Sequence, residues 1–286
     1  MLAHLSKHGP GIGRSLWRTL WPTVSRGEAR ETAERFRRVY AQVHPLELEE
    51  LAWPRPGAVW AMDHTESKDA TKRPIFSVRD LASGKQLAWQ IVESADAAST
   101  LAILNRLSGE HGQPLVLKSD NGPAFTADLV QDWLSDHGVT PLLSPPYCPT
   151  YNGAVEWAGG RMKERTMWTA RDCESWTDEH LEAARLASNE LPRMANPADA
   201  SPDQLWPARQ PITEAERAAF LDRLAEERVQ ALAEAEAQGK DLDRRSVKAA
   251  VERTAIRRAL VAHGFLRVSK RTIPLPKRLL MYAKIL

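Results

Sequence analysis

The sequence predicts an α/β protein built on a mixed five-stranded sheet flanked by helices, with helical extensions at both ends. Five short apolar runs have the length of strands, and they alternate with stretches of helical periodicity. Their order is three strands, helix, strand, helix, strand, helix. The 286 residues allow one main domain with one or two small appended modules. The strands are expected at residues 58–65, 74–80, 86–93, 115–119 and 140–143.

The helices of the core are predicted from the spacing of their apolar residues. Residues 95–110 carry leucines at helical intervals, and residues 124–137 carry one apolar side. A third helix is expected after the proline-rich segment at 144–149. With this order of elements, the first strand is expected to be central and the fourth to pair beside it. Residues far apart in the sequence then meet at one edge of the sheet.

Prolines mark the borders of this core and separate it from both ends of the chain. Pro54 and Pro56 precede the first strand, and Pro202 and Pro207 follow the last helix of the core. We therefore expect a helical N-terminal arm at residues 1–54, the sheet domain at 55–210, and a helical, basic region at 211–286.

The two end regions have their own predicted elements. Ser25 and Glu28 form a capping-box signal for a basic helix at residues 26–43. This helix fits either the end of a partial helix-turn-helix that faces DNA or a plain helical arm. In the C-terminal region we expect helices at 213–238 and 244–263 and a strand at 265–268.

The net charge of +2 hides a strong asymmetry along the chain. Residues 1–57 hold nine Lys or Arg and six Asp or Glu, and residues 239–286 hold thirteen and three. The segment between them therefore carries −11. An acidic centre between basic ends fits a metal-dependent enzyme that binds a polyanion, although a basic tail can also be merely a solvated surface.

Several classes of protein are disfavoured by the composition. No apolar stretch has the length of a membrane span, and the N-terminus lacks the apolar segment of a signal peptide. Cys148 and Cys173 give neither a disulfide framework nor a zinc pattern, and no Cys-x-x-Cys follows His4 and His8. We expect a cytoplasmic protein.

Three acidic residues lie where an isolated carboxylate is costly. Asp63 ends the first apolar run, Asp120 closes the fourth, and Glu156 lies near the start of the helix after the proline-rich loop. Burying an unpaired carboxylate costs several kcal/mol, so each needs a cation or a donor nearby. A bound divalent metal ion is the simplest explanation for all three.

Three segments carry these acids: WAMDHT at residues 60–65, KSDNGPAF at 118–125, and SPPYCPTYNGAVE at 144–156. Together they resemble the catalytic core of DDE transposases and retroviral-type integrases. The similarity is greatest to bacterial insertion-sequence transposases with 35 residues between the second and third acids, the spacing found here. The resemblance covers roughly residues 55–210 and implies a ribonuclease-H-like fold.

The resemblance also implies a function. It predicts a transposase that processes transposon ends and joins a 3′-hydroxyl to target DNA, with two Mg²⁺ ions per active site, replaceable by Mn²⁺. Asp63 would bridge the two ions, Asp120 would complete the shell of one, and Glu156 that of the other. The implied partners are DNA ends, target DNA, further copies of the chain, and an upstream-frame DNA-binding protein, in a bacterial, nucleoid-associated setting.

Further residues are assigned from their positions near the three acids. Lys163 lies two helical turns after Glu156, where the family has a basic residue that contacts the transposon end. Asn152, with Gly153, is expected to cap this helix. The residues expected to contact DNA are Lys163, Asn121, Asn152, Arg161 and His64.

Several of these residues have structural alternatives. Asn121 would equally serve the turn after the fourth strand, His64 would equally be a packed or solvated histidine, and Arg161 a solvated one. Trp157 is expected to pack, and the acidic residues Glu66, Asp69 and Asp80 to lie in turns at the surface.

Two other functions compete with the transposase. A nuclease of the same fold would only hydrolyse nucleic acid, and a catalytically silent DNA-binding protein would not be expected to keep all three acids. The first of these is the stronger alternative, because fold alone does not separate it from a transposase.

Overall fold

The computed structural model describes residues 22–145, 149–194 and 196–274, and its contacts divide them into two compact units. One unit runs from Ala52 to Arg267 and contains the five-stranded sheet. The other consists of the described residues up to Leu51 and from Val268 onward. His4, His8 and Cys148 lie outside the described residues. The predicted division at residues 54 and 210 stays a prediction.

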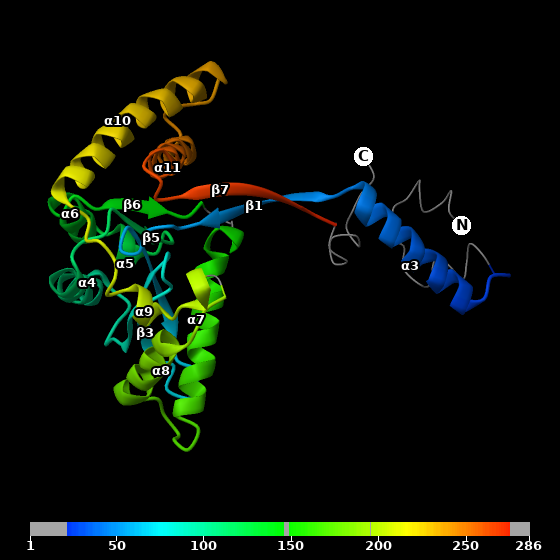
Figure 1. Ribbon diagram of the computed structural model, residues 1–286, viewed down its shortest axis with the longest axis horizontal. Coiled ribbons are helices and arrows are strands. Elements are labelled where there is room, and N and C mark those ends of the chain that lie inside the picture. Colours follow the sequence, from blue (N-terminus) through cyan, green and yellow to red (C-terminus); the bar gives the residue numbers. More distant parts are fainter. Residues whose placement is uncertain (1–21, 146–148, 195, 275–286) are drawn as a thin grey trace. The chain divides into compact units, whose positions relative to one another are not determined.

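The sheet has the predicted mixed, five-stranded architecture, in the order β4-β3-β2-β5-β6. Figure 1 labels three of its strands, β3, β5 and β6. The central strand β2 pairs antiparallel with β3 on one side and parallel with β5 on the other, and β5 pairs parallel with β6. The first strand is therefore central and the fourth lies beside it, as the sequence predicts. The strands are β2 (Val59–Glu66), β3 (Pro74–Asp80), β4 (Gln86–Ile91), β5 (Val116–Ser119) and β6 (Thr140–Leu143).

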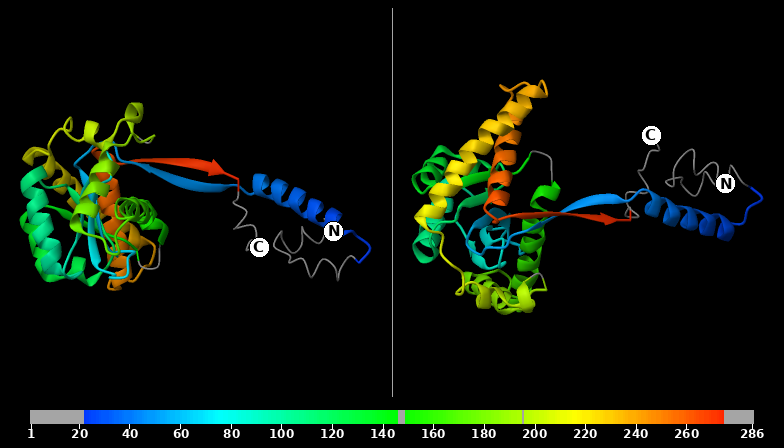
Figure 2. Two further views of the ribbon diagram at one scale, coloured as in Figure 1. Left: turned by 90° about the horizontal axis from the view of Figure 1, so that it is seen from below. Right: turned by 45° about the horizontal axis from the view of Figure 1, so that its top comes forward.

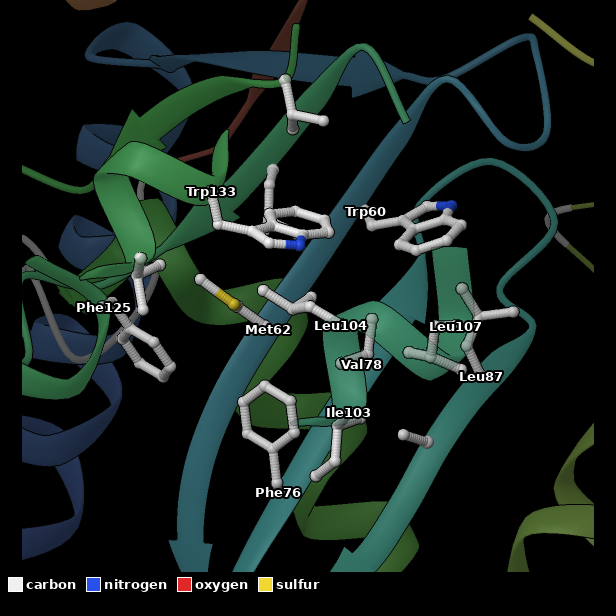
Figure 3. Packing of buried hydrophobic residues seen from close by; sticks show 14 of the residues in the cluster. Trp60, Met62, Phe76, Val78, Leu87, Ile103, Leu104, Leu107, Phe125 and Trp133 are labelled. Atoms are coloured by element: carbon white, nitrogen blue, oxygen red, sulfur yellow. The ribbon is translucent and has the colours of Figure 1, made fainter. Parts of the chain in front are cut away.

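One face of the sheet is covered by α4 (Ala97–His111), α5 (Pro123–Thr126) and α6 (Asp128–Asp136). The core on this face is dominated by large aromatic and aliphatic side chains, among them Trp60, Met62, Phe76, Leu104 and Phe125 (Figure 3). Trp60 and Met62 are two residues apart in β2, so their side chains point to the same face of the sheet.

The single helix predicted at 124–137 is wrong in one respect, because the structure breaks it at Ala127. The backbone of Ala127 is extended (φ −63°, ψ 140°), and this residue is the N-cap of α6. The short helix α5 before the break holds Phe125 in the core, where it is 3% exposed.

The opposite face of the sheet carries α7 (Pro149–Thr169) and α8 (Asp178–Glu190). Ile75 and Trp89 point to this face and pack with Met162 of α7 and Leu181 of α8. The indole nitrogen of Trp89 also donates to the hydroxyl of Thr166, at 2.9 Å. Helix α7 is therefore fixed to the sheet through its central turns.

The chain continues through η1 (Pro197–Asp199) and α9 (Pro202–Leu205) to two long helices, α10 (Glu214–Ala237) and α11 (Arg245–Ala262). These two helices lie side by side (Figure 2) and bury Phe220, Leu224 and Ile256. At the base of α10 the guanidinium of Arg217 is buried. It donates to the backbone carbonyls of Gln113, Pro114 and Gly138, at 2.8 to 2.9 Å.

The other unit contains α3 (Arg26–Val43) and a two-stranded sheet of β1 (Leu46–Ala52) and β7 (Arg267–Ile273). The capping box predicted for α3 is confirmed, since Ser25 and Glu28 each accept from the backbone N–H of the other. Strand β1 was not predicted, because its alternation of leucine and glutamate extends only over residues 46–49 and its side chains are mostly exposed. Two of its acids form ion pairs with bases of β7, Glu47 with Lys270 and Glu50 with Arg271. None of the helices within the described residues is long and apolar enough to cross a membrane.

Candidate active site

Two of the three predicted acids, Asp63 and Asp120, lie near the carboxyl ends of neighbouring parallel strands. In the β2–β5 ladder Ala61 is the partner of Lys118. Asp63 and Asp120 each lie two residues further along, so both carboxylates lie at the same edge of the sheet. Asp63 is still within β2 and half-buried, whereas Asp120 lies just beyond β5 and is exposed.

The Asp63 carboxyl is influenced by its burial and by the charges of the other two acids. Burial raises this pKa first, and the charges of Asp120 and Glu156 raise it further, to about 6 from an ordinary 3.8. Lys163 and a backbone hydrogen bond at His64 act in the opposite direction. Helix α7 contacts β2, and the charge of Glu156 on this helix is near enough to act on Asp63.

Backbone and side-chain hydrogen bonds hold Asp120 and its turn. One carboxylate oxygen of Asp120 accepts from the N–H of Gly122, at 2.8 Å. The side-chain amide of Asn121 donates to the backbone carbonyl of Ser144, at 2.6 Å, and so ties the end of β5 to the segment after β6. This bond supports the structural alternative for Asn121, a role in the turn.

Glu156 lies well inside α7, not at its beginning. The helix begins at Pro149, so Asn152 and Gly153 are in its first turns. The prediction that these two residues cap the helix is therefore wrong. A proline suits the first helical position because its missing N–H would have no partner there, which explains the earlier start. The side chain of Asn152 lies outside the described residues, and its contact with DNA stays a prediction.

Lys163 lies on the same side of α7 as Glu156, because seven residues complete nearly two turns. Burial lowers the pKa of its ammonium, and the nearby ammonium groups of Lys68 and Lys72 lower it further, against the charges of Asp63 and Glu66. Three lysines therefore gather beside the acids. Lys68 and Lys72 were not predicted as site residues, because they belong to the connection between β2 and β3 and are part of no recognisable motif.

His64 points to the face of β2 opposite Asp63, into the aromatic core. Its ring stacks on Phe125 at 5.1 Å between centroids and contacts Phe76 at 4.6 Å. The hydroxyl of Thr100 donates to a backbone carbonyl, so it accepts from the Nε2–H of His64, at 3.1 Å. Burial is the main cause that lowers the pKa of this imidazole. These contacts favour the packed histidine over a DNA contact.

Arg161 and Trp157 lie together on the exposed surface of α7. The guanidinium of Arg161 is 5.7 Å from the ring centroid of Trp157 and pairs with Glu164 at 2.9 Å. The indole of Trp157 is 62% exposed, so the prediction that it packs in the core or at a boundary is wrong. Trp157 directly follows Glu156, whose side chain points away from the core. The next residue along a helix can point away from the core as well.

Asp80 is a further correction, since it was expected at the surface and is fully buried. Its carboxylate accepts from the backbone N–H of Gly57 and from the N–H and hydroxyl of Ser83. It closes the turn between β3 and β4. Asp69 is likewise held by hydrogen bonds, including one from the N–H of Trp176, and its carboxyl pKa is well below the usual range.

The donor chemistry of the site fits a hard divalent cation. Mg²⁺ prefers carboxylate oxygens and commonly binds through one or two of them together with water and substrate phosphate. Burial and the charges of Asp120 and Glu156 together raise the pKa of Asp63, and a cation bound beside these carboxylates would offset that cost. Within residues 22–145, 149–194 and 196–274, no three His, Cys, Asp or Glu side chains are placed to hold one ion together. The candidate ligands of a divalent cation are therefore pairs of carboxylates, Asp63 with Asp120 and Asp63 with Glu156.

Known proteins resemble the part of the chain that carries the first two acids. Residues 54–149 match the family model of the integrase core domain, a segment that includes Asp63 and Asp120 and ends before Glu156. The resemblance predicted from the three motifs is confirmed.

The curated relatives include proteins of mobile elements and retroviruses. The chain is 26% identical over 119 residues to an uncharacterized 39.2 kDa protein of insertion element IS476 from Xanthomonas euvesicatoria, a match that covers 41% of this chain and 34% of that protein. It is 33% identical over 122 residues to the Gag-Pol polyprotein of bovine immunodeficiency virus, covering 43% of this chain and 8% of the polyprotein. The match therefore spans about a third or less of these relatives.

A solved structure supports the fold. A chain of the simian T-cell lymphotropic virus intasome, solved in complex with the PP2A regulatory subunit B56 gamma, has a TM-score of 0.50 and 18% sequence identity. The superposition covers 71% of this chain and 78% of that chain. The predicted ribonuclease-H-like fold is confirmed.

Proposed function

We propose that this chain, whose residues 54–149 form an integrase core domain, is a DNA transposase that processes transposon ends and transfers a 3′-hydroxyl to target DNA. One observation carries the proposal. Asp63 and Asp120 lie at the same level on adjacent parallel strands, and Glu156 of α7 is near enough to raise the pKa of Asp63. Three acids from three distant segments thus gather at one edge of an integrase core.

We propose Mg²⁺ as the cofactor, replaceable by Mn²⁺. Asp63 would be shared between two ions, Asp120 would hold one and Glu156 the other. When bound, the ions activate the attacking oxygen and neutralise charge on the phosphoryl and leaving oxygens. Adjacent parallel strands bring Asp63 and Asp120 to one edge of the sheet, and Gly122 and Asn121 fix the turn of Asp120.

The lysines beside the acids would position the DNA backbone. Lys68 and Lys72 are close enough to Lys163 to lower the pKa of its ammonium, and such repulsion is relieved when a phosphate lies between the ammonium groups. Lys163 shares the face of Glu156, so its ammonium would hold the strand next to the scissile phosphate. Arg161 lies on another side of α7 and pairs with Glu164, which makes it the weaker candidate for this contact.

The basic C-terminal region would add affinity that does not depend on sequence. Part of its charge is already compensated within the described residues, because Lys270 pairs with Glu47 and Arg271 with Glu50. Arg258 of α11 pairs in the same way with Glu234 of α10. The remaining bases of residues 240–284 would bind phosphates. We further propose that the chain acts in the bacterial cytoplasm, as an oligomer on DNA, and that an upstream-frame protein supplies end recognition.

A gel assay with labelled DNA ends taken from the flanks of the gene tests the proposed function. With wild-type protein and Mg²⁺, we expect shortened ends together with longer products in which the end is joined to target DNA. If only shortened products form in both Mg²⁺ and Mn²⁺, the chain is a nuclease and the proposal is wrong.

A further inference from the structure

The connection between β2 and β3 is a closed loop with a carboxylate inside it. We call residues 67–73 the β2–β3 loop. At its base the backbone N–H of Ser67 donates to the carbonyl of Arg73, at 2.9 Å. One carboxylate oxygen of Asp69 accepts from the hydroxyl of Ser67 at 2.7 Å, and from the N–H and the hydroxyl of Thr71 at 3.1 and 2.6 Å. The loop is therefore folded around Asp69.

The other carboxylate oxygen of Asp69 attaches this loop to the segment that follows α7. It accepts from the backbone N–H of Trp176, at 2.5 Å, and the guanidinium of Arg73 donates to the carbonyl of the same residue. The indole of Trp176 is buried in the core cluster that includes Met162 of α7, so the point of attachment is itself fixed. Both backbone polar groups of Trp176 are thus bonded from the β2–β3 loop.

The loop held in this way carries two exposed lysines, Lys68 and Lys72. Within the part of the chain that the structure describes, neither takes part in an ion pair. The backbone of Lys72 has a φ of 52°, a left-handed conformation that residues other than glycine rarely adopt. Such a conformation persists where the surrounding structure holds it, and here the preceding Thr71 is bonded twice to Asp69.

The lysines of the β2–β3 loop lie near Lys163 of α7. Burial lowers the pKa of the Lys163 ammonium, and the charges of Lys68 and Lys72 lower it further. A loop free to move would relieve this repulsion by carrying its lysines away. The bonds of Asp69 prevent that movement, so the three charges are in place before an anion binds. Binding then does not have to order the loop, which favours affinity.

The acids nearby do not cancel the charge of these lysines. Asp63 belongs to the proposed metal site, and the carboxylate of Asp69 is engaged by its donors within the loop and at Trp176. Glu66 is exposed and remains as one acid beside the lysines, since its charge also acts on Lys163. A phosphate backbone at this place therefore meets an excess of positive charge.

We propose that Asp69 is a positioning residue for DNA binding. By joining the β2–β3 loop to the backbone of Trp176, it holds the two lysines of the loop beside Lys163, where all three contact phosphates of the bound DNA. Asp69 itself does not touch the DNA. This inference rests on the proposed function only through the DNA contact of the lysines, and not through metal binding or strand transfer.

Fluorescence anisotropy of a labelled duplex from the flanks of the gene, titrated with the full-length chain in the presence of a chelator, tests this role. We expect Asp69→Ala to weaken binding about tenfold, which is about 1.4 kcal/mol. The substitution removes a negative charge near the DNA, so electrostatics alone would tighten binding. The sign of the change therefore distinguishes positioning from charge. Glu174→Ala is the matched control, because it removes an exposed acid of the α7–α8 connection, and it should not weaken binding.

Further variants separate positioning from a general loss of structure. Replacing both Lys68 and Lys72 with Ala should weaken binding about tenfold. It should also make the slope of log affinity against log salt shallower by about 1.8, at about 0.9 per phosphate contact. Adding Asp69→Ala to this double variant should cause no further loss, because Asp69 acts through these lysines. Thr71→Val removes one donor to Asp69 and should weaken binding about threefold, which keeps the test open if circular dichroism shows that Asp69→Ala does not fold.

Four results would overturn the proposal. The first is a folded Asp69→Ala variant, or in its place Thr71→Val, that binds DNA as tightly as wild type or more tightly. The second is a loss from Asp69→Ala that persists when both lysines of the loop are already absent. The third is a double lysine variant that binds like wild type, and the fourth is a wild-type chain with no measurable affinity for DNA. A wild-type chain that cleaves ends without joining them would contradict the transposase and leave these binding measurements unaffected.

Discussion

Replacing Asp63 with Asn should stabilise the metal-free protein at the same time as it removes activity. A carboxyl whose pKa is raised in the folded state destabilises that state once it ionises. The cost is absent below the unfolded pKa of 3.8 and is fully present above the folded pKa of about 6. At 1.36 kcal/mol per pKa unit, this interval corresponds to at most about 3 kcal/mol.

The magnitude predicts a specific pH dependence of unfolding. At pH 8 without metal, Asp63→Asn should be more stable than wild type by about 1–3 kcal/mol, because the amide does not ionise. Below pH 4 the two proteins should have nearly the same free energy of unfolding. Urea unfolding followed by circular dichroism, at pH 4, 6 and 8 with a chelator present, measures this difference. Asp132→Asn is the matched control, because Asp132 is an exposed acid of α6.

The same experiment with added Mg²⁺ tests whether the crowded carboxylates bind a cation. An ion that binds only the folded state stabilises it by mass action. Wild type should therefore gain stability with Mg²⁺ at pH 8, and Asp63→Asn should gain much less. A variant that is less stable than wild type at pH 8, or a stability difference that does not change with pH, would refute the reasoning about Asp63.

Further predictions concern the remaining parts of the site and the fold. Asp120→Asn and Glu156→Gln should each reduce strand transfer more than tenfold, above 1.4 kcal/mol in barrier, while gel-shift affinity for DNA stays near wild type. Lys163→Ala should lower joining of cognate ends by one to two orders of magnitude, about 1.5–3 kcal/mol, in the same gel assay. Deleting residues 275–286, which hold Lys277, Arg278 and Lys284, should flatten the plot of log affinity against log salt, since each phosphate contact contributes about −0.9, and an unchanged slope would exclude a DNA contact there. Arg217→Ala should lower the free energy of unfolding by about 2–4 kcal/mol in urea, because three backbone carbonyls lose their donor.

The sequence was sufficient to predict the sheet and the edge where the acids meet. Its strands are apolar runs bounded by turn residues, and Asp63 and Asp120 end two of them, so local patterns decide most of the architecture. The helices at 26–43 and 213–238 were predicted to within one residue at each end, because their capping residues are explicit. The capping box at Thr213 and Glu216 is one example.

What the sequence could not provide depends on contacts between distant segments. The position of Asp80 in a turn predicts a surface acid. The folded chain instead buries it, and Gly57 and Ser83 donate hydrogen bonds to its carboxylate. Lys68 and Lys72 become candidates for binding DNA only because folding places them near Lys163. Strand β1 is acidic and exposed, and only its pairing with β7 shows that it is a strand.

The tryptophans of α7 illustrate the same limit. Trp157 was predicted to pack because tryptophan is usually buried, and Trp168 of the same helix is exposed as well. Once the buried side of α7 is identified by Ala158 and Met162, the positions of both indoles follow from helical geometry, and they face solvent.

The strand-transfer assay on the three acid variants is the most direct test of the central claim, that Asp63, Asp120 and Glu156 form one catalytic site. A labelled, pre-processed DNA end would be incubated with a target plasmid and Mg²⁺, and the joined product would be quantified for wild type and for Asp63→Asn, Asp120→Asn and Glu156→Gln. The account predicts that wild type joins the end and that each variant does not, while all four proteins remain folded and bind DNA. A variant that retains more than about a tenth of the wild-type rate, a loss below 1.4 kcal/mol, would show that its carboxylate is not part of the site.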